Sequence, residues 1–86
     1  MGAPKVLMYG SHWCGYCSRA RTLLGHKGIA FQEIDVDATP GARAEMIARS
    51  GGRSTVPQIF IGENHIGGAE VLHELESAGR LDPMLK

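Results

Sequence analysis

The chain has two cysteines, Cys14 and Cys17, separated by two residues. In a reducing compartment such a pair is more often redox-active or metal-binding than structural. As a staple it would close a very small loop and remove little entropy from the unfolded chain. Zinc takes about four ligands, and His12 with the two cysteines leaves that set incomplete. The spacing therefore favours thiol–disulfide chemistry.

The residues around this pair predict a helix that places the two sulfurs. It spans residues 15–27, with apolar Ala20, Leu23 and Leu24 on one face and Arg19 and Arg21 facing outward. Gly28 stands where a C-terminal cap is expected. Cys14 would lie at the helix start, where free N–H groups and the helix dipole favour a thiolate, the nucleophilic form. Cys17, one turn inside, is expected to be the more buried, resolving thiol.

The other elements follow from hydrophobic patterning. Strands are predicted at residues 5–9, 29–36, 57–62 and 65–66, the last two forming a hairpin. A second helix is expected to open with Thr39 as its cap and Pro40 in its first turn, and to bury Ala42, Met46 and Ile47. A third helix is predicted at residues 69–78, with Val71, Leu72 and Leu75 on one face, before a short final turn at Leu81, Met84 and Leu85.

The order of elements is βαβ, then α, then ββα. A strand–helix–strand unit implies parallel pairing through a right-handed crossover, and the hairpin adds antiparallel strands. We therefore predict an α/β thioredoxin fold, with a four-stranded mixed sheet flanked by helices on both faces. The length of 86 residues fits a single domain, 1–86.

Composition excludes several other classes of protein. Nine basic residues balance nine acidic ones, so the chain lacks the charge excess of a nucleic-acid binder. No apolar run approaches the roughly 20 residues of a membrane span. The N-terminus leaves no room for a signal sequence, which makes the cytoplasm the expected location. His26, His65 and His73 are interpreted as surface or turn residues.

Three motifs in register carry a resemblance to a known family. They are Trp13-Cys14-Gly15-Tyr16-Cys17, the segment Thr55-Val56-Pro57-Gln58-Ile59-Phe60-Ile61, and Gly67-Gly68 before the last helix. Together with the helix around Arg43 and the ending Leu81-Asp82-Pro83, they make the chain similar to dithiol glutaredoxins, above all the short bacterial ones. The resemblance covers essentially the whole chain.

The resemblance implies a glutathione site beside Cys14. The Val56–Pro57 bond would be cis, presenting the backbone of Val56 to the tripeptide as a strand adds to a sheet edge. The free N–H groups of Ala69 and Glu70 would bind the γ-glutamyl carboxylate, and the Glu70 carboxylate its ammonium group. The full set of expected glutathione-binding residues is Tyr16, Arg43, Thr55, Val56, Pro57, Gly68, Ala69 and Glu70.

The chain departs from the family pattern at several positions near this site. Ser11 stands where the family usually has Lys, Gly15 where it has Pro, and Val71 where it has a second acidic residue. Arg53 is a candidate for the missing cation. These differences bear on glutathione affinity more than on the thiol chemistry.

Three functional hypotheses follow. The first is a monomeric glutathione-dependent oxidoreductase, with Cys14 as nucleophile and Cys17 as resolving thiol, acting on glutathionylated or disulfide-containing proteins. The second is a dimer that bridges a [2Fe-2S] cluster through Cys14 and glutathione, which Gly15 favours because family members that do so often lack the Pro. The third is a thioredoxin-like electron donor reduced by a flavoprotein, which Trp13 and the missing lysine favour. Trp13 could also contact a protein partner.

Overall fold

A computed structural model describes residues 4–85 of the chain. In chain order its elements are β1 (Val6–Gly10), α1 (Gly15–His26), β2 (Gln32–Asp35), α2 (Ala42–Arg49), β3 (Gln58–Ile61), β4 (Asn64–Gly67), α3 (Ala69–Ser77) and α4 (Leu81–Met84). Residues 1–3, on which the expectation about a signal sequence partly rests, lie outside the described range.

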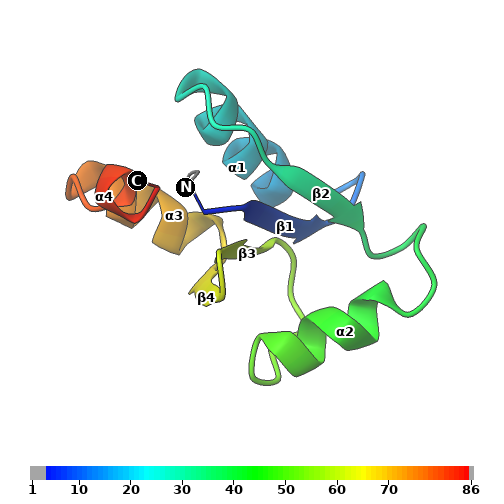
Figure 1. Cartoon of the computed structure of the whole chain (residues 1–86). Helices are drawn as coiled ribbons and strands as arrows, with labels where there is room; N and C mark the ends of the chain where they lie inside the picture. The colour runs from blue at the N-terminus through cyan, green and yellow to red at the C-terminus, as the bar shows by residue number, and fades with distance from the viewer. Residues whose placement is uncertain (1–3, 86) are drawn as a thin grey trace.

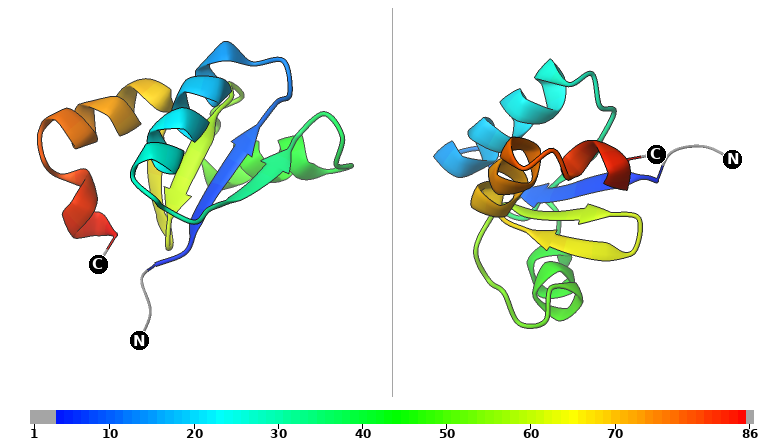
Figure 2. Two further views of the ribbon diagram at one scale, coloured as in Figure 1. Left: turned by 90° about the horizontal axis from the view of Figure 1, so that it is seen from above. Right: turned by 90° about the vertical axis from the view of Figure 1, so that its left-hand side faces the viewer.

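The four strands form one mixed sheet in the order β2-β1-β3-β4. Strand β1 pairs parallel to β2 and antiparallel to β3, and β3 pairs antiparallel to β4. Helices α1, α3 and α4 cover one face of the sheet and α2 covers the other (Figures 1 and 2). The predicted thioredoxin fold, with its mixed sheet between two helical layers, is confirmed.

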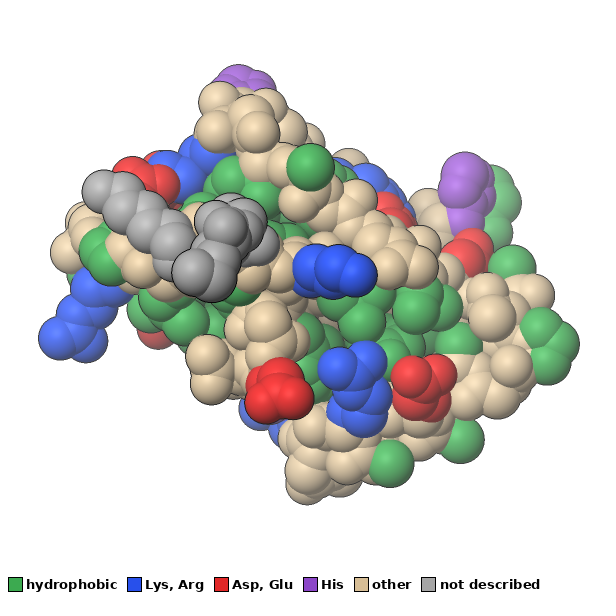
Figure 3. All heavy atoms as spheres, viewed as in Figure 1, with side chains coloured by type: hydrophobic (Ala, Val, Ile, Leu, Met, Phe, Trp, Pro, Cys, Tyr) green, Lys and Arg blue, Asp and Glu red, His purple; other side chains and the backbone are tan. Residues whose placement is uncertain are grey.

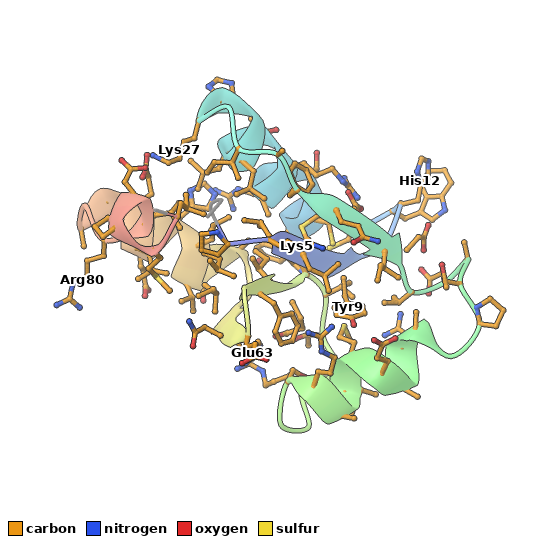
Figure 4. All side chains as sticks on the ribbon, in the orientation of Figure 1. Lys5, Tyr9, His12, Lys27, Glu63 and Arg80 are labelled. Carbon is orange, nitrogen blue, oxygen red and sulfur yellow. The ribbon has the colours of Figure 1, made fainter. Side chains whose placement is uncertain are left out.

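Each face of the sheet has its own apolar core, as alternation along the strands requires. On the α1/α3 side, Met8 and Ile59 pack with Leu24, Leu72 and Leu81. On the α2 side the buried residues are Tyr9, Val36, Ala42, Met46 and Phe60. The side chain of Tyr9 points toward α2 (Figure 4). Of the predicted inner stripe of α2, Ala42 and Met46 are buried, and Ile47 is half-buried and packs against them.

The second strand, Gln32–Asp35, is shorter than the predicted 29–36, and Ile29 instead completes the end of α1. Gly28 has φ 69°, and the next N–H, that of Ile29, donates to the carbonyl of Leu24 at 3.0 Å. This is the 6→1 hydrogen bond of a Schellman cap, which a glycine at this position makes accessible. An apolar residue in a cap contact resembles a strand residue in sequence, so the prediction of residues 29–36 began the strand too early.

The start of the second helix was also predicted wrongly. The α2 helix begins at Ala42 after Gly41, whose φ is 81°, and no side chain caps it. Thr39 instead takes part in a turn, in which its carbonyl accepts from the N–H of Ala42 at 3.1 Å. Thr39 and Pro40 therefore form the turn that precedes the helix, and they are not its cap and first turn.

Helix α3 does not bury all three residues predicted for its inner face. Leu72 is fully buried and Leu75 packs at the edge of the core, whereas Val71 is exposed. Val71 covers Gly67 instead, since a Cβ on that glycine would lie 3.2 Å from the Cγ2 of Val71. Val71 therefore packs against the turn into α3 rather than the core.

Charged side chains join the helices at the periphery. The Lys27 ammonium at the end of α1 lies 2.9 Å from a carboxylate oxygen of Glu76 and 2.7 Å from one of Asp82, linking α1 to α3 and α4 (Figure 4). Basic and acidic side chains are interspersed on the face seen in Figure 3. Among residues 4–85, no helix has both the length and the apolar character needed to cross a bilayer.

Candidate active site

Cys14 is the N-cap of α1, with its sulfur at the open end of the helix. The Sγ accepts a hydrogen bond from the backbone N–H of Cys17 at 3.2 Å. On its other side, the Sγ lies 3.5 Å from the carbonyl oxygen of Val56, which accepts from the thiol. The residue is half-buried and its thiol is free. Cys14 thus lies at the helix start, where the sequence placed it, and a first-turn N–H donates to its sulfur.

Cys17 differs sharply from Cys14 in its surroundings. It is completely buried, and its Sγ accepts from the backbone N–H of Ser11 at 3.4 Å. Burial, together with the neighbouring Cys14, raises the pKa of the Cys17 thiol to about 12. Cys17 is therefore protonated near neutral pH, which suits a thiol that acts second.

A groove beside Cys14 collects seven of the eight residues predicted to bind glutathione. Its volume is about 300 Å³. It is lined by Tyr16, Thr55, Val56, Pro57, Gly68, Ala69 and Glu70. Tyr16 is 59 % exposed and stands at the rim. Residues far apart in sequence thus meet at the sulfur, at the end of the sheet where α1 and α3 both begin.

Two backbone features shape the walls of this groove. The Val56–Pro57 peptide bond is cis, as the resemblance implies. Across from it lies Gly68 at the start of α3, where a Cβ would lie 3.4 Å from the carbonyl oxygen of Pro57, an ordinary contact distance. The backbone N–H groups at the start of α3 remain available to an anion.

Arg43 lies outside the groove lining, in contrast to the other predicted residues. Its guanidinium donates to the Asp37 carboxylate at 3.0 Å and to the Ser54 carbonyl at 3.2 Å. The second Asp37 oxygen accepts from the Ser11 hydroxyl at 2.6 Å. The Ser11 hydrogen bond, followed by Arg43, lowers the pKa of Asp37. Arg43 is thus paired with the Asp37 carboxylate. Its second partner, Ser54, immediately precedes the groove residue Thr55. Arg53, the other candidate cation, is exposed and lies outside the lining too.

His65 was interpreted as a surface or turn residue, and the structure gives it a specific contact. Its Nε2 lies 2.6 Å from the Oε1 of Gln58, which is fully buried. The Gln58 amide donates in turn to the carbonyl and hydroxyl of Thr55, at 2.9 and 3.2 Å. This chain of contacts connects β4 to the cis-proline loop. A polar residue at an inward strand position was the one signal in the sequence that pointed to Gln58.

Arg21 was predicted to face outward, but it folds back against the sheet. Its guanidinium makes two hydrogen bonds of 2.6 Å to Glu33 on β2 and one of 3.2 Å to the carbonyl of Ser11.

Trp13 is 88 % exposed and contacts the ring of His12 edge-on. Within the described residues, no group of three or more His, Cys, Asp or Glu side chains is arranged to hold a metal ion.

A cysteine pair at the start of α1, facing a cis-proline loop on a four-stranded mixed sheet, defines the thioredoxin-fold class of thiol oxidoreductases. Within that class, the glutaredoxin family model matches residues 6–66. The chain is 55 % identical over 82 residues to a glutaredoxin of Pseudomonas aeruginosa, covering 95 % of this chain and 96 % of the relative. It is 52 % identical to glutaredoxin 3 of Escherichia coli, covering 95 % and 98 %. The chain belongs to the glutaredoxin family.

Solved structures agree with this assignment. The solution structure of glutaredoxin from Brucella melitensis superposes with a TM-score of 0.85 at 51 % identity, covering 100 % of this chain and 92 % of that one. A buckwheat glutaredoxin–glutathione complex gives 0.86 at 35 % identity, with 96 % and 76 % covered. A structure described as metal binding of glutaredoxins gives 0.74 at 52 % identity, with 98 % and 90 % covered.

Proposed function

We propose that this glutaredoxin is a glutathione-dependent oxidoreductase that reduces glutathione mixed disulfides and protein disulfides. The observation that carries the proposal is the position of the Cys14 sulfur. It lies at the open end of α1, 3.5 Å from the carbonyl of Val56, a residue that lines the groove leading to the start of α3. A groove of this size beside a thiolate suits a short peptide thiol. The buckwheat relative was solved as a glutathione complex.

The first half of the reaction forms a mixed disulfide on Cys14. The Cys14 thiolate attacks the glutathione sulfur of a protein–glutathione disulfide, and the new Sγ–sulfur bond replaces the old one. The protein sulfur leaves as a thiolate and takes a proton from solvent. A second glutathione, as its thiolate, then attacks the bound glutathione sulfur. Oxidised glutathione forms and the Cys14 thiolate is released.

The groove residues would hold the tripeptide during these steps. The backbone of Val56 would pair with the cysteinyl unit, while the Thr55 and Pro57 backbone shapes the wall beside it. The N–H groups of Ala69 and Glu70, made accessible by Gly68, would bind the γ-glutamyl carboxylate. The Glu70 carboxylate would meet the γ-glutamyl ammonium, and the Tyr16 ring would pack on the tripeptide. Arg43 would reach the glycyl carboxylate after releasing Asp37.

With protein disulfides the second cysteine takes part. Cys17 attacks the sulfur of Cys14 in the mixed disulfide, the Cys14–Cys17 bond forms, and the substrate sulfur leaves as a thiolate. Two glutathione molecules then return the pair to the dithiol. This cycle needs a reducing pool, so the cytoplasm is the proposed location. We propose that the chain 1–86 acts as one domain and as a monomer.

The first prediction tests the roles of the two cysteines. Cys14→Ser is expected to abolish turnover of a glutathione mixed disulfide, because no other thiolate faces the groove. Cys17→Ser is expected to keep at least half of that activity, since glutathione can resolve the intermediate. Reduction by glutathione is compared with reduction by a thioredoxin-reductase system. A Cys17 variant without activity would contradict the monothiol half of the mechanism, and exclusive use of the flavoprotein would favour the thioredoxin-like alternative.

A second candidate function is a glutathione-ligated [2Fe-2S] cluster held between two copies of the chain. Gly15, in place of the usual Pro, has open space around its Cα, and the adjacent Cys14 sulfur is partly accessible. Cys14 would be the protein ligand from each copy, and the cluster would supply electron transfer or storage. Anaerobic purification with glutathione should then give a brown dimer. A colourless monomer after reconstitution with iron, sulfide and glutathione would exclude this candidate.

A further inference from the structure

The pair of Arg21 and Glu33 lies next to the buried cysteine but is not used in the reaction described above. The guanidinium and carboxylate form two hydrogen bonds of 2.6 Å, and both side chains are more than two-thirds buried. Paired hydrogen bonds of this kind fix orientation as well as charge. Two charged groups held this firmly against β2 are unusual for an outward helix position.

This ion pair meets Cys17 at Gly10, the last residue of β1. A Cβ on Gly10 would lie 3.0 Å from the Oε2 of Glu33 and 3.3 Å from the Sγ of Cys17. The carboxylate and the sulfur therefore pack over the same bare Cα. Arg21 and Cys17 are also four residues apart on α1, which places them on one face of the helix.

Ser11 connects the arginine to both cysteines through its backbone. Its carbonyl accepts from Arg21 at 3.2 Å and from the N–H of Cys14 at 3.3 Å. Its N–H donates to the sulfur of Cys17 at 3.4 Å. Arg21 thus holds the residue whose N–H faces the buried sulfur.

We propose that Arg21, held in place by Glu33, is a positioning residue for the resolving step. It orients Ser11 toward Cys17 and puts a fixed positive charge one helical turn from the sulfur that becomes the attacking anion. When a substrate occupies Cys14 as a mixed disulfide, Cys14 carries no charge. The negative charge then develops on Cys17 alone. The Arg21 guanidinium, which cannot lose its proton, there offsets the Glu33 carboxylate held over Gly10.

The step is a thiol–disulfide exchange within the enzyme. The Cys17 thiol gives its proton to solvent, its sulfur attacks the Sγ of Cys14, and the bond from Cys14 to the substrate sulfur breaks. The substrate leaves as a reduced thiol after taking a proton from solvent, and the Cys14–Cys17 disulfide is the oxidised product. In the monothiol reaction Cys17 is a bystander. Arg21 should therefore matter for protein disulfides and not for glutathione mixed disulfides.

This inference rests on the proposed function, and the experiment separates the two. Turnover of a protein disulfide and of a small glutathione mixed disulfide is measured for the wild type, Arg21→Met, Arg21→Lys and the matched control Arg19→Met. Arg19 lies on the same helix and is exposed. If the wild type turns over neither substrate with glutathione, the proposed function itself has failed.

Given an active wild type, Arg21→Met should slow protein-disulfide reduction about tenfold, on the scale of one favourable nearby charge. It should change the mixed-disulfide rate less than twofold. Arg21→Lys keeps the charge but not the paired hydrogen bonds, so an intermediate rate is expected. In a Cys17→Ser background, Arg21→Met should have no effect on the mixed disulfide.

Two results would overturn the inference. One is an equal loss on both substrates, with the loss persisting in the Cys17→Ser background, which would indicate a general structural role. The other is an unchanged protein-disulfide rate in Arg21→Met. If Arg21→Met does not fold, as judged by thermal unfolding, the same comparison with Arg21→Lys decides, because a selective loss supports the role and an equal or absent loss refutes it.

Discussion

At the scale of single residues, the two cysteines differ because one caps a helix and the other lies inside it. Cys14 receives an N–H from the first turn and keeps access to the groove. Cys17 has no exposed surface. Two identical thiols three residues apart therefore differ in exposure. In the proposed reaction the first attacks a substrate and the second attacks the first.

This difference predicts selective alkylation. Burial raises the pKa of Cys17 to about 12, so at pH 7.5 almost none of it is the reactive thiolate. Iodoacetamide should label Cys14 in the native protein and leave Cys17 unlabelled until the chain is unfolded in urea. Mass spectrometry of proteolytic peptides locates the label. Equal labelling of both cysteines in the native state would contradict this account.

At the scale of elements, the site depends on loops that tie β2, α2 and the cis-proline segment together. Asp37 follows β2 and binds both Ser11 and Arg43, while Arg43 on α2 also binds the Ser54 carbonyl. Ser11 contributes a hydroxyl and no charge to this contact. Among the side-chain contacts of Asp37 in the described structure, only Arg43 carries a positive charge that balances the carboxylate.

Removing the Asp37 charge should therefore help an anionic ligand. In Asp37→Asn the guanidinium of Arg43 loses its carboxylate partner and becomes available to the glycyl carboxylate of glutathione. We expect the KM for glutathione to fall only about two- to fivefold, because an exposed ion pair is weak. Glu63→Gln, a remote charge change in the β3–β4 turn, serves as control (Figure 4). A higher KM in Asp37→Asn would instead show that Asp37 holds Arg43 in its binding position.

At the scale of the whole molecule, two apolar cores on opposite faces of the sheet hold the groove together. The buried side chain of Gln58 links His65 on β4 to Thr55, which is exposed at the groove. Burial, followed by the charge of Arg53, lowers the pKa of His65 in the folded protein. The folded state therefore binds a proton less readily than the unfolded chain does.

That shift predicts a loss of stability in mild acid. Above the unfolded-state pKa of His, about 6.5, both states are neutral at His65 and no stability is lost. As the pH falls below that value, the unfolded chain gains the proton first and the free energy of unfolding decreases. Urea unfolding at pH 7.5 and 5.5 measures the change. His65→Gln, which can still donate to Gln58, should show a smaller decrease, and an identical decrease would contradict the assignment.

The sequence alone determined the elements, their order and the reactive pair. Periodicity and turn residues are local signals, so they located the three main helices and the hairpin, and the thioredoxin layout followed from their order. The local signals failed at the ends of elements. Ile29 closes a helix cap instead of starting a strand, and Thr39 belongs to a turn before α2, because both outcomes depend on hydrogen bonds to residues outside the predicted segment.

Only the tertiary structure decided what each polar side chain contacts. The partners of Arg21, Arg43 and His65 lie 12, 6 and 7 residues away, on other strands and loops. A helical arginine has the same local pattern whether it is solvated or paired, so the pattern could not distinguish these cases. Hydrophobic spacing specifies which face of an element is buried. Which charged or polar groups lie next to a buried face is decided by how the elements pack. In this protein the packing of α1 on the sheet brings Arg21 and Glu33 close to the sulfur of Cys17.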